Sequence, residues 1–396
     1  MRWLSQTTAV IALNLRTVPA RLSSSGVAII GIAGVVVVFV SVLSIGAGFS
    51  AAMQGSGSPS RALVMRSGAD TEMTSGLDGA DIDVIRQAPG IRRGSAGPIA
   101  SAELYVILDV PKKVSPSTAA NVPMRGIEPA GVAVREEVSI VEGRMLEFGT
   151  TEVVVGRAAS GQFINMSVGD TIVSGQTRWQ VVGLFEADGG VAETEIWADA
   201  RTLQGAYRRG NTYQSMLVQL DSTDAFDPFR DWLTANPQVN VSIRRENEYY
   251  AAQSIAMTRL IRTIGFGIAT LMGIGAVFGA ILTMYTAVAT RAREIATLRA
   301  LGFDTMSVLV SVLAESLTLG AIGGVLGGLA AYLAFNGYQT STMNFQTFTQ
   351  VAFAFRVTPE LLGMGLAYAL AMGLVGGLLP AIRAARLPIA SALREL

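Results

Sequence analysis

The chain contains no cysteine and no histidine. Without cysteine, no part of it can rely on disulfide bonds, even in an oxidising compartment. Zinc sites built from Cys and His are excluded, and so are the Ser-His-Asp and Cys-His arrangements of nucleophilic catalysis. Chemistry by carboxylates alone stays open, so a membrane enzyme of that kind is the least favoured of the functions considered below.

Charge is also scarce, since 15% of the residues are charged, 50% are hydrophobic and the mean hydropathy is +0.44. These values are typical of a membrane protein. Four stretches contain no Lys, Arg, Asp or Glu, and each exceeds the roughly 20 apolar residues that a membrane-spanning helix needs. We therefore expect an α-helical membrane protein with four transmembrane helices. The charge-free stretches are Leu22–Ser60, Thr263–Thr290, Ser316–Phe355 and Leu361–Ile382.

The first stretch follows several arginines and could be a cleavable signal peptide. Its apolar run is longer than the roughly 7 to 15 residues of a signal peptide, which favours an uncleaved transmembrane helix at residues 23–51. The preceding residues, 1–22, mix apolar and polar side chains, as an amphipathic helix on the cytoplasmic face of the membrane would. An ordinary flexible tail is the alternative for that segment.

Positively charged residues indicate which ends of the spans face the cytoplasm. Three arginines and no acidic residue precede the first span, and arginines also dominate residues 291–304 and the tail at 383–396. We therefore expect these segments, including both termini, on the cytoplasmic side. Residues 52–258 would then lie outside. They hold 18 basic and 25 acidic residues, so the neutral chain divides into an acidic outer part and a basic remainder.

The outer part, residues 52–250, begins after the helix-breaking Gly55–Pro59 and is expected to form an α+β domain. Its two ends repeat one pattern, in which a strand is followed by a helix, a turn and a second strand. Two such units can pair into one mixed sheet with the helices on one face. The repeat comprises Arg61–Ser67, Gly79–Gln87 and Ala102–Val110, and then Ser215–Asp221, Ala225–Ala235 and Val239–Arg244.

Residues 122–207 lie between the two units and contain short β-rich runs, which predict a small inserted subdomain. The sequence after Glu246 has a helical composition, so the second transmembrane helix, within 251–290, is expected to begin outside the bilayer as a stalk. The third and fourth spans are expected at 305–336 and 361–382. Pro380 should kink or end the fourth span, and residues 337–360 are expected to form a loop between the two.

The segment 291–304, between the second and third spans, is expected to form a short cytoplasmic helix. Ile295, Leu298 and Leu301 recur at helical spacing as one apolar stripe, and Gly302 suits the C-terminal cap. Arg291, Arg293 and Arg299 occupy the rest of its surface, together with Glu294. A helix this short needs a partner surface, which could be a protein or the lipid.

Glu315 is a lone carboxylate near the cytoplasmic end of the third span. Acidic residues inside a membrane are costly, so we expect it to reach lipid headgroups or an arginine such as Arg299. A proton-relay role is the less favoured alternative.

Pairs of glycines one helical turn apart would let helices pack closely. These pairs are Gly275 and Gly279, Gly323 and Gly327, and Gly373 and Gly377, together with Gly324 and Gly328.

Several motifs occur in the order found in one transporter family. The run R-x-R-E-I-x-x-L-R-A-L-G at Arg291–Gly302 is followed by Ala314–Leu317, the glycines at Gly323–Gly328 and the carboxyl-terminal Pro380–Arg394. In the outer part the motifs are Met124–Pro129, Val141–Arg144 and Glu152–Gly156. With them the chain resembles the MacB/FtsX-type ABC permeases, members of the type VII ABC superfamily.

The resemblance implies a homodimer in the bacterial cytoplasmic (inner) membrane, with residues of about 52–258 in the periplasm. It also implies a separate ABC ATPase subunit, of the MacB or LolD kind, into which the helix at Arg293–Leu301 docks. The sequence has no G-x-x-x-x-G-K-[ST] phosphate loop, so ATP and Mg²⁺ are expected on the partner and no cofactor, metal or catalytic residue on this chain. A periplasmic adaptor and an outer-membrane channel are further partners that the resemblance implies, and the chain would also contact the lipid bilayer. No nucleic acid is expected as a partner.

Two functions are therefore compatible with the motifs. A transporter would convert ATP hydrolysis into motion of the outer domain, driving export or extraction of a substrate. The large outer domain with its insertion favours this function. An FtsX-like regulator would instead activate an extracytoplasmic partner, such as a cell-wall hydrolase.

Overall fold

The computed structural model describes residues 22–388, which fall into two compact units. A helical unit includes the chain up to Ala47, Arg259–Tyr338 and the chain from Phe355 onward. A sheet unit consists of Gly48–Thr258 and Gln339–Ala354. The predicted helix at 1–22 and the last residues of the predicted tail lie outside the described residues.

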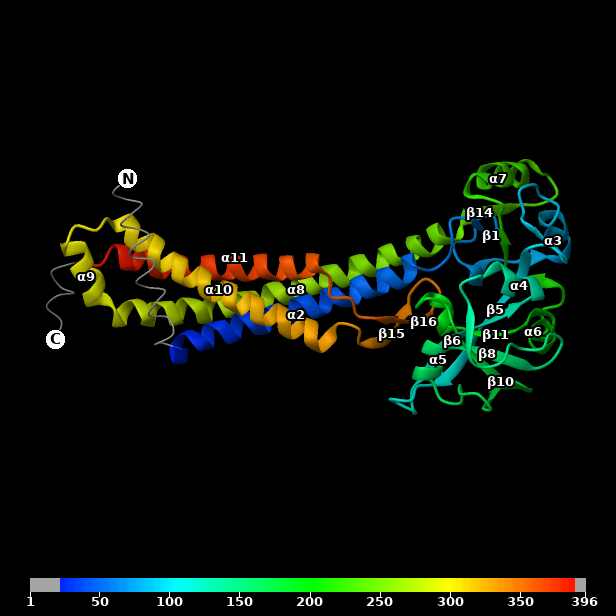
Figure 1. Cartoon of the computed structure of the whole chain (residues 1–396), viewed down its shortest axis with the longest axis horizontal. Coiled ribbons are helices and arrows are strands. Elements are labelled where there is room, and N and C mark those ends of the chain that lie inside the picture. The colour runs from blue at the N-terminus through cyan, green and yellow to red at the C-terminus, as the bar shows by residue number, and fades with distance from the viewer. Residues whose placement is uncertain (1–21, 389–396) are drawn as a thin grey trace. The chain divides into compact units, whose positions relative to one another are not determined.

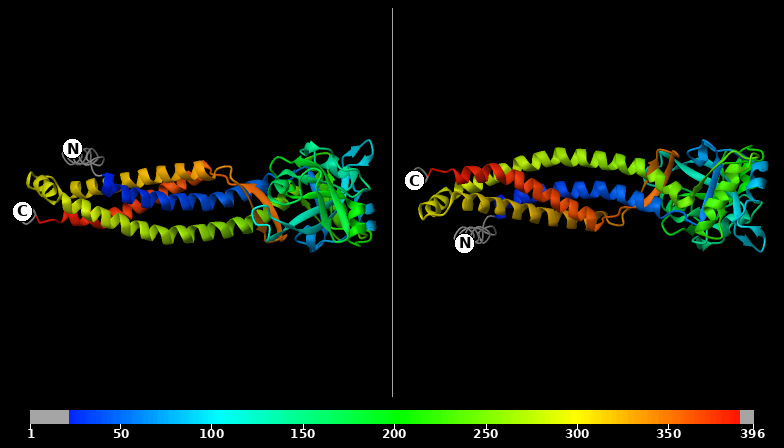
Figure 2. Two further views of the ribbon diagram at one scale, coloured as in Figure 1. Left: turned by 90° about the horizontal axis from the view of Figure 1, so that it is seen from below. Right: turned by 90° about the horizontal axis from the view of Figure 1, so that it is seen from above.

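The described chain contains four helices that are long and apolar enough to cross a membrane, as predicted. Within a helix every peptide group bonds to the same segment, so these stretches need no water to satisfy their main chain. Figures 1 and 2 show the four helices side by side. They are α2 (Leu22–Gln54), α8 (Glu246–Thr290), α10 (Thr305–Phe335) and α11 (Pro359–Ala385).

The ends of these helices follow local chemistry. Pro359 occupies the first turn of α11, where it costs no hydrogen bond, and the Thr358 hydroxyl accepts from the Leu361 N–H. Pro380 lies inside α11, which continues to Ala385, so the alternative in which Pro380 ends the span is wrong. Helix α8 is continuous from Glu246 to Thr290, although its first residues belong to the sheet unit.

The sheet unit is built on one mixed sheet of ten strands. Nine of them run in the order β14 (Val241–Arg245), β1 (Arg61–Arg66), β13 (Ser215–Gln219), β5 (Ala100–Pro111), β6 (Ala119–Ile127), β11 (Ile196–Asp199), β8 (Glu152–Gly156), β10 (Thr177–Glu186) and β7 (Ser139–Gly143). The tenth, β9 (Thr171–Ser174), pairs with β10.

The predicted split repeat is confirmed. The strands β1, β5, β13 and β14 are antiparallel neighbours, in the order of a split β-α-β fold. The two helices of the repeat, α3 (Gly79–Ile85) and α7 (Phe226–Ala235), bury apolar side chains in one cluster with β1 and β13. One face of this half of the sheet is therefore covered by helices.

The insertion is β-rich, as predicted, and its residues form an apolar core with β5 that includes Val122, Val153 and Trp179. Its strands β6, β11, β8, β10 and β7 extend the same sheet outward from β5. The reason is that β5 and β6 form a long hairpin, in which Leu104 opposes Gly126 and Pro111 opposes Ala119.

The other short elements are α4 (Pro129–Val134), α5 (Arg157–Gln162), α6 (Ala200–Ala206), the 3-10 turns η2 (Glu72–Thr74), η3 (Val191–Thr194) and η4 (Thr223–Ala225), and the strand pairs β2 (Leu77–Asp78) with β12 (Thr212–Tyr213) and β3 (Arg93–Gly94) with β4 (Gly97–Pro98).

The segment between α10 and α11 is more ordered than the predicted loop. It forms a hairpin of β15 (Gln339–Asn344) and β16 (Thr349–Ala354) that belongs to the sheet unit. The Thr194 hydroxyl accepts a hydrogen bond from the Ala352 N–H, and the Asn121 amide donates to the Phe348 carbonyl. The hairpin is thus attached to the sheet by its main chain, which composition alone could not indicate.

Candidate functional site

The predicted short helix is present as α9 (Ala292–Ala300), directly after α8. It ends in a two-bond C-terminal cap. The Gly302 N–H donates to the Arg299 carbonyl and the Phe303 N–H donates to the Leu298 carbonyl, both at 3.1 Å. Gly302 has a φ of 92°, which a residue with a Cβ adopts only with strain. The glycine therefore sets where the helix stops.

The predicted apolar stripe of α9 does not stay on one face. Ile295 is buried within the helical unit, in a cluster with Met284, Val308 and Ala381. Leu298 is half-buried, and Leu301 is 73% exposed. Leu301 leaves the stripe because α9 ends at Ala300, so that Leu301 is the C-cap and no longer follows the helical spacing.

The charged residues of this segment divide in the same way. Arg293 and Glu294 are exposed. The Arg299 guanidinium instead donates to the Leu387 carbonyl at 2.7 Å, which joins α9 to the chain just after α11. Ile295 and Arg299 of the predicted docking surface therefore hold α9 within the helical unit. The exposed residues of that surface are Arg293, Glu294 and Leu301.

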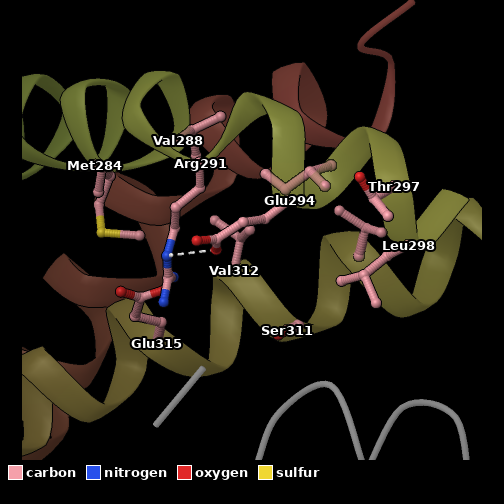
Figure 3. A pocket seen from close by; sticks show the side chains of 12 residues that line it. Met284, Val288, Arg291, Glu294, Thr297, Leu298, Ser311, Val312 and Glu315 are labelled. Atoms are coloured by element: carbon pink, nitrogen blue, oxygen red, sulfur yellow. Dashed lines mark hydrogen bonds and ion pairs between the residues drawn. The ribbon is translucent and has the colours of Figure 1, made fainter. Parts of the chain in front are cut away.

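A cavity of about 310 Å³ lies between the end of α8, α9 and α10 (Figure 3). Most of its walls are apolar, and the ion pair between Arg291 Nη1 and Glu315 Oε2, at 2.9 Å, lies inside it. The cavity is lined by Met284, Ala287, Val288, Arg291, Glu294, Ile295, Thr297, Leu298, Val308, Ser311, Val312 and Glu315.

The partner of Glu315 therefore differs from the expected one. Its carboxylate pairs with Arg291, whereas Arg299 binds a main-chain carbonyl. Both members of the pair are buried, with Arg291 5% exposed and Glu315 3% exposed. Sequence reasoning counted Arg291 among the positive charges beside the second span and missed its pairing. Its position directly after Thr290, at the end of an apolar run, was the available signal.

The ion pair fixes the turn between α8 and α9 to α10. Arg291 is the N-cap residue of α9, and its Nε also lies 3.7 Å from the Glu294 carboxylate. An ion pair among apolar side chains is strong, yet its burial costs desolvation, so its main effect is to select one geometry. Here that geometry is the orientation of α9 relative to α8 and α10.

The predicted glycine pairs have two different environments. A Cβ at Gly323 or Gly327 would lie 3.0 Å or less from main-chain oxygens of α2, and one at Gly373 would lie 2.8 Å from the Ser316 carbonyl of α10. At Gly377 the neighbour is the Ser316 side chain. These glycines allow close packing of α2, α10 and α11. At Gly275 and Gly279 on α8, no other part of the described chain lies within 4 Å.

The sheet unit contains a second set of buried charges that sequence reasoning did not find. The Arg125 guanidinium lies 2.7 to 2.8 Å from carboxylate oxygens of Glu72, Glu103 and Glu195, and Arg135 lies 2.6 Å from Glu103. Burial alone would raise the pKa of the Glu103 carboxyl, but Arg135 and Arg125 outweigh it and hold the pKa below its usual value. No acidic cluster suited to a metal ion occurs within residues 22–388.

Comparison with known proteins places both units. The family model described as the MacB-like periplasmic core domain matches residues 25–236, more than half of the chain. The model described as the FtsX-like permease C-terminal region matches residues 266–389. A search of curated proteins gave no match.

Two solved structures are similar to part of the chain. One is the periplasmic region of MacB from Actinobacillus actinomycetemcomitans, with 16% identity and a TM-score of 0.37, covering 50% of this chain and 92% of that one. The other is the extracellular domain of the noncanonic ABC-type transporter YknZ from Gram-positive bacteria, with 14% identity and a TM-score of 0.35, covering 46% and 99%. On the two family models, the chain belongs to the MacB/FtsX-type, or type VII, ABC permeases, inner-membrane proteins that work with an ABC ATPase subunit.

Proposed function

We propose that this chain is the non-catalytic membrane subunit of an ATP-driven complex and passes motion from a separate ATPase to its sheet unit. That motion drives export of a substrate, or its extraction from the periplasm or from the outer leaflet of the membrane. The observation that carries the proposal is the continuity of α8. A single helix joins the sheet unit at Glu246 to Thr290, and only Arg291 separates it from α9.

The proposed contact with the ATPase is the exposed part of α9 and its cap. Arg293, Glu294 and Leu301 offer charge and one apolar side chain to a partner, while Ile295, Arg291 and Arg299 hold α9 in the helical unit. ATP and Mg²⁺ would be bound by the partner. This chain would contribute position and movement only.

The proposed functional form is a homodimer. Helix α8 is the least buried of the four spans, with 22% of its most apolar window buried against 39 to 50% in the others. Its glycines at 275 and 279 have open space beside them, which allows the backbone of a second copy to approach closely. In this arrangement the sheet units would face the periplasm, where a periplasmic adaptor and an outer-membrane channel could receive a substrate.

The experiment is co-purification of the detergent-solubilised chain with its ABC ATPase, comparing wild type with Leu301→Asp. A charge at this exposed position should leave folding intact and sharply reduce both ATPase recovery and ATP-dependent transport. Val173→Asp is the matched control, because Val173 is 66% exposed and lies on β9 of the sheet unit. Full ATPase recovery and activity with Leu301→Asp would contradict docking at α9. Hydrolase activation without transport would establish the FtsX-like alternative.

A further inference from the structure

Within the sheet unit, the segment that follows α2 and the first turn of α8 meet at one carboxylate. Glu246, the first residue of α8, is 4% exposed. Its Oε2 accepts a hydrogen bond from the Ser58 N–H at 3.0 Å and lies 2.6 Å from Nε of Arg61. Ser58 follows the end of α2, and Arg61 begins β1. One side chain therefore holds the segment after α2, the first strand of the sheet and the start of α8.

The arginine in this contact is itself fixed to the sheet unit. Arg61 is 4% exposed, and its guanidinium also donates to both carboxylate oxygens of Glu137, at 2.7 and 2.9 Å, and to the Val134 carbonyl at 3.0 Å. The guanidinium therefore makes contacts through Nε, Nη1 and Nη2. Glu246 is thus bound to an arginine that is fixed to the sheet unit. If α8 moved alone, Arg61 could not easily move with it.

The glycine before Ser58 is required for this contact. Gly57 has a φ of 81°, and a Cβ there would lie 2.8 Å from Cγ of Glu246 and 3.0 Å from the Asn247 nitrogen. Composition indicated only that Gly55–Pro59 interrupts a helix. The structure shows that Gly57 also lets the main chain approach the Glu246 side chain.

Close packing does not hold this segment in place. A cavity of about 230 Å³ adjoins the ion pair, with Gly55–Ser58 on one side and Asp188–Ala192 among its other walls. Arg61, Arg135 and Glu246 also line it. A segment beside open space keeps one position only if specific bonds hold it, because packing there is incomplete. The Glu246 carboxylate supplies one of those bonds, to the Ser58 N–H, and the Ser56 hydroxyl supplies another by accepting from the Val191 N–H at 2.8 Å.

We infer that Glu246 is a positioning residue that joins the segment after α2, strand β1 and helix α8 into one rigid joint. Movement of α8 then carries the sheet with it and is not absorbed by the Gly55–Pro59 linker. The inference rests on the proposed function and adds to it the residues through which the sheet unit receives the motion.

The test is the ATP-dependent distance change between fluorophores on cysteines at Ser117, in the sheet unit, and Glu360, an exposed residue in the first turn of α11 in the helical unit. The chain has no native cysteine, so labelling is specific. The protein is reconstituted with its ATPase in lipid nanodiscs. Glu246→Gln should lose most of the ATP-dependent change while ATP hydrolysis continues. Glu248→Gln is the control, because it removes a carboxylate from the same turn whose side chain is 64% exposed.

A second variant keeps all charges in place. Gly57→Ala adds a methyl group against Glu246 and should cause the same loss of the distance change, so it decides the question if Glu246→Gln folds poorly. A full wild-type distance change in either folded variant would overturn the joint. Absence of any ATP-dependent change in the wild type would instead refute the proposed function and leave the geometry of the joint unaffected.

Discussion

At the scale of residues, the orientation of α9 depends on charges that the protein has removed from water. Arg291 and Glu315 form an ion pair in a cavity with largely apolar walls, and Met284, Val288 and Val312 lie around them (Figure 3). Glu294 also lies near Arg291, at 3.7 Å, but its side chain is largely exposed. Loss of one partner would leave the other charged and buried.

The first prediction concerns this pair. Glu315→Gln should destabilise the helical unit by about 3 kcal/mol, the usual cost of leaving one member of a buried ion pair without its partner. The measurement is the melting midpoint of the full chain in detergent. Glu294→Gln, on the exposed side of the same arginine, should change the midpoint little. Equal midpoints for the two variants would show that the buried pair does not hold α9.

The second prediction concerns acid. The pKa of the Glu137 carboxyl is lowered like that of Glu103; in each case burial would raise it, and the neighbouring arginines outweigh burial. Such a carboxyl stabilises the fold above its unfolded pKa, and this stabilisation is lost as pH falls through the lower folded pKa. Below the ordinary value of 4.5, the melting midpoint of the full chain should therefore fall as these two carboxyls become protonated. A midpoint that rises on acidification would contradict this.

At the scale of elements, glycines allow the helices to pack closely against one another. Helix α10 packs α2 against Gly323 and Gly327 on one side and α11 against Gly320 and Gly324 on the other. Since lipid is as apolar as the side chains, close contact and not hydrophobic burial stabilises such a bundle. Helix α8 also contacts α11 closely, with Ala280 beside Gly376 and Gly273 beside Tyr368, but it is the least buried of the four spans, which fits its proposed role as the element that moves.

The third prediction tests that packing. Gly327→Ala places a Cβ 2.6 Å from the Ala33 carbonyl oxygen and 2.8 Å from Cβ of Val36, so α2 and α10 must separate. Overpacking of this kind costs about 1 to 3 kcal/mol. The melting midpoint should fall, whereas Gly363→Ala, at a position on α11 with open space beside it, should leave it unchanged or raise it. An unchanged melting midpoint for Gly327→Ala would show that α2 and α10 do not pack closely at this glycine.

Elements with strong local patterns could be predicted from the sequence. The four spans follow from uncharged runs, and the split repeat follows from β1, α3, α7 and β13, whose apolar residues alternate or recur at helical spacing. The hairpin of β15 and β16 could not be predicted, because its place depends on bonds to Thr194 and Asn121, which are distant in sequence. The β-rich character of the insertion was predicted, but its attachment to the repeat through the β5–β6 hairpin was not, since strand pairing is long-range.

The candidate site shows the same limit. Gly302 was predicted as a cap, because a glycine after a helical run is a local signal. The partners of Glu315 and Arg299 were not predicted, since pairing depends on how α8, α10 and α11 meet. The Arg125 and Glu246 contacts were missed entirely, because charged residues in a sequence are ordinarily assigned to the surface.

At the scale of the whole molecule, charge is divided between the two sides. Residues 52–258 hold 25 acidic and 18 basic residues, while the chain as a whole is neutral. Arginines near the ends of spans stay in the cytoplasm, so this division supports a topology with α9 inside and the sheet unit outside.

The fourth prediction tests that topology. Ser117→Cys, on the sheet unit, should react with a membrane-impermeant maleimide applied to cells whose outer membrane is permeabilised. Ala300→Cys, at the end of α9, should react only after the inner membrane is opened. The cysteine-free parent supplies the background. Reaction of Ala300→Cys in cells with an intact inner membrane would reverse the assigned sides.

The central claim is that ATP hydrolysis by a separate subunit moves the sheet unit through α8. The measurement that tests it most directly is the distance between labels at Ser117 and at Glu360 of α11 in nanodiscs, with and without the ATPase and with and without ATP. The account predicts a shift in the distance distribution that requires both the ATPase and ATP and reverses after hydrolysis. An unchanged distribution in a complex that actively hydrolyses ATP would contradict it.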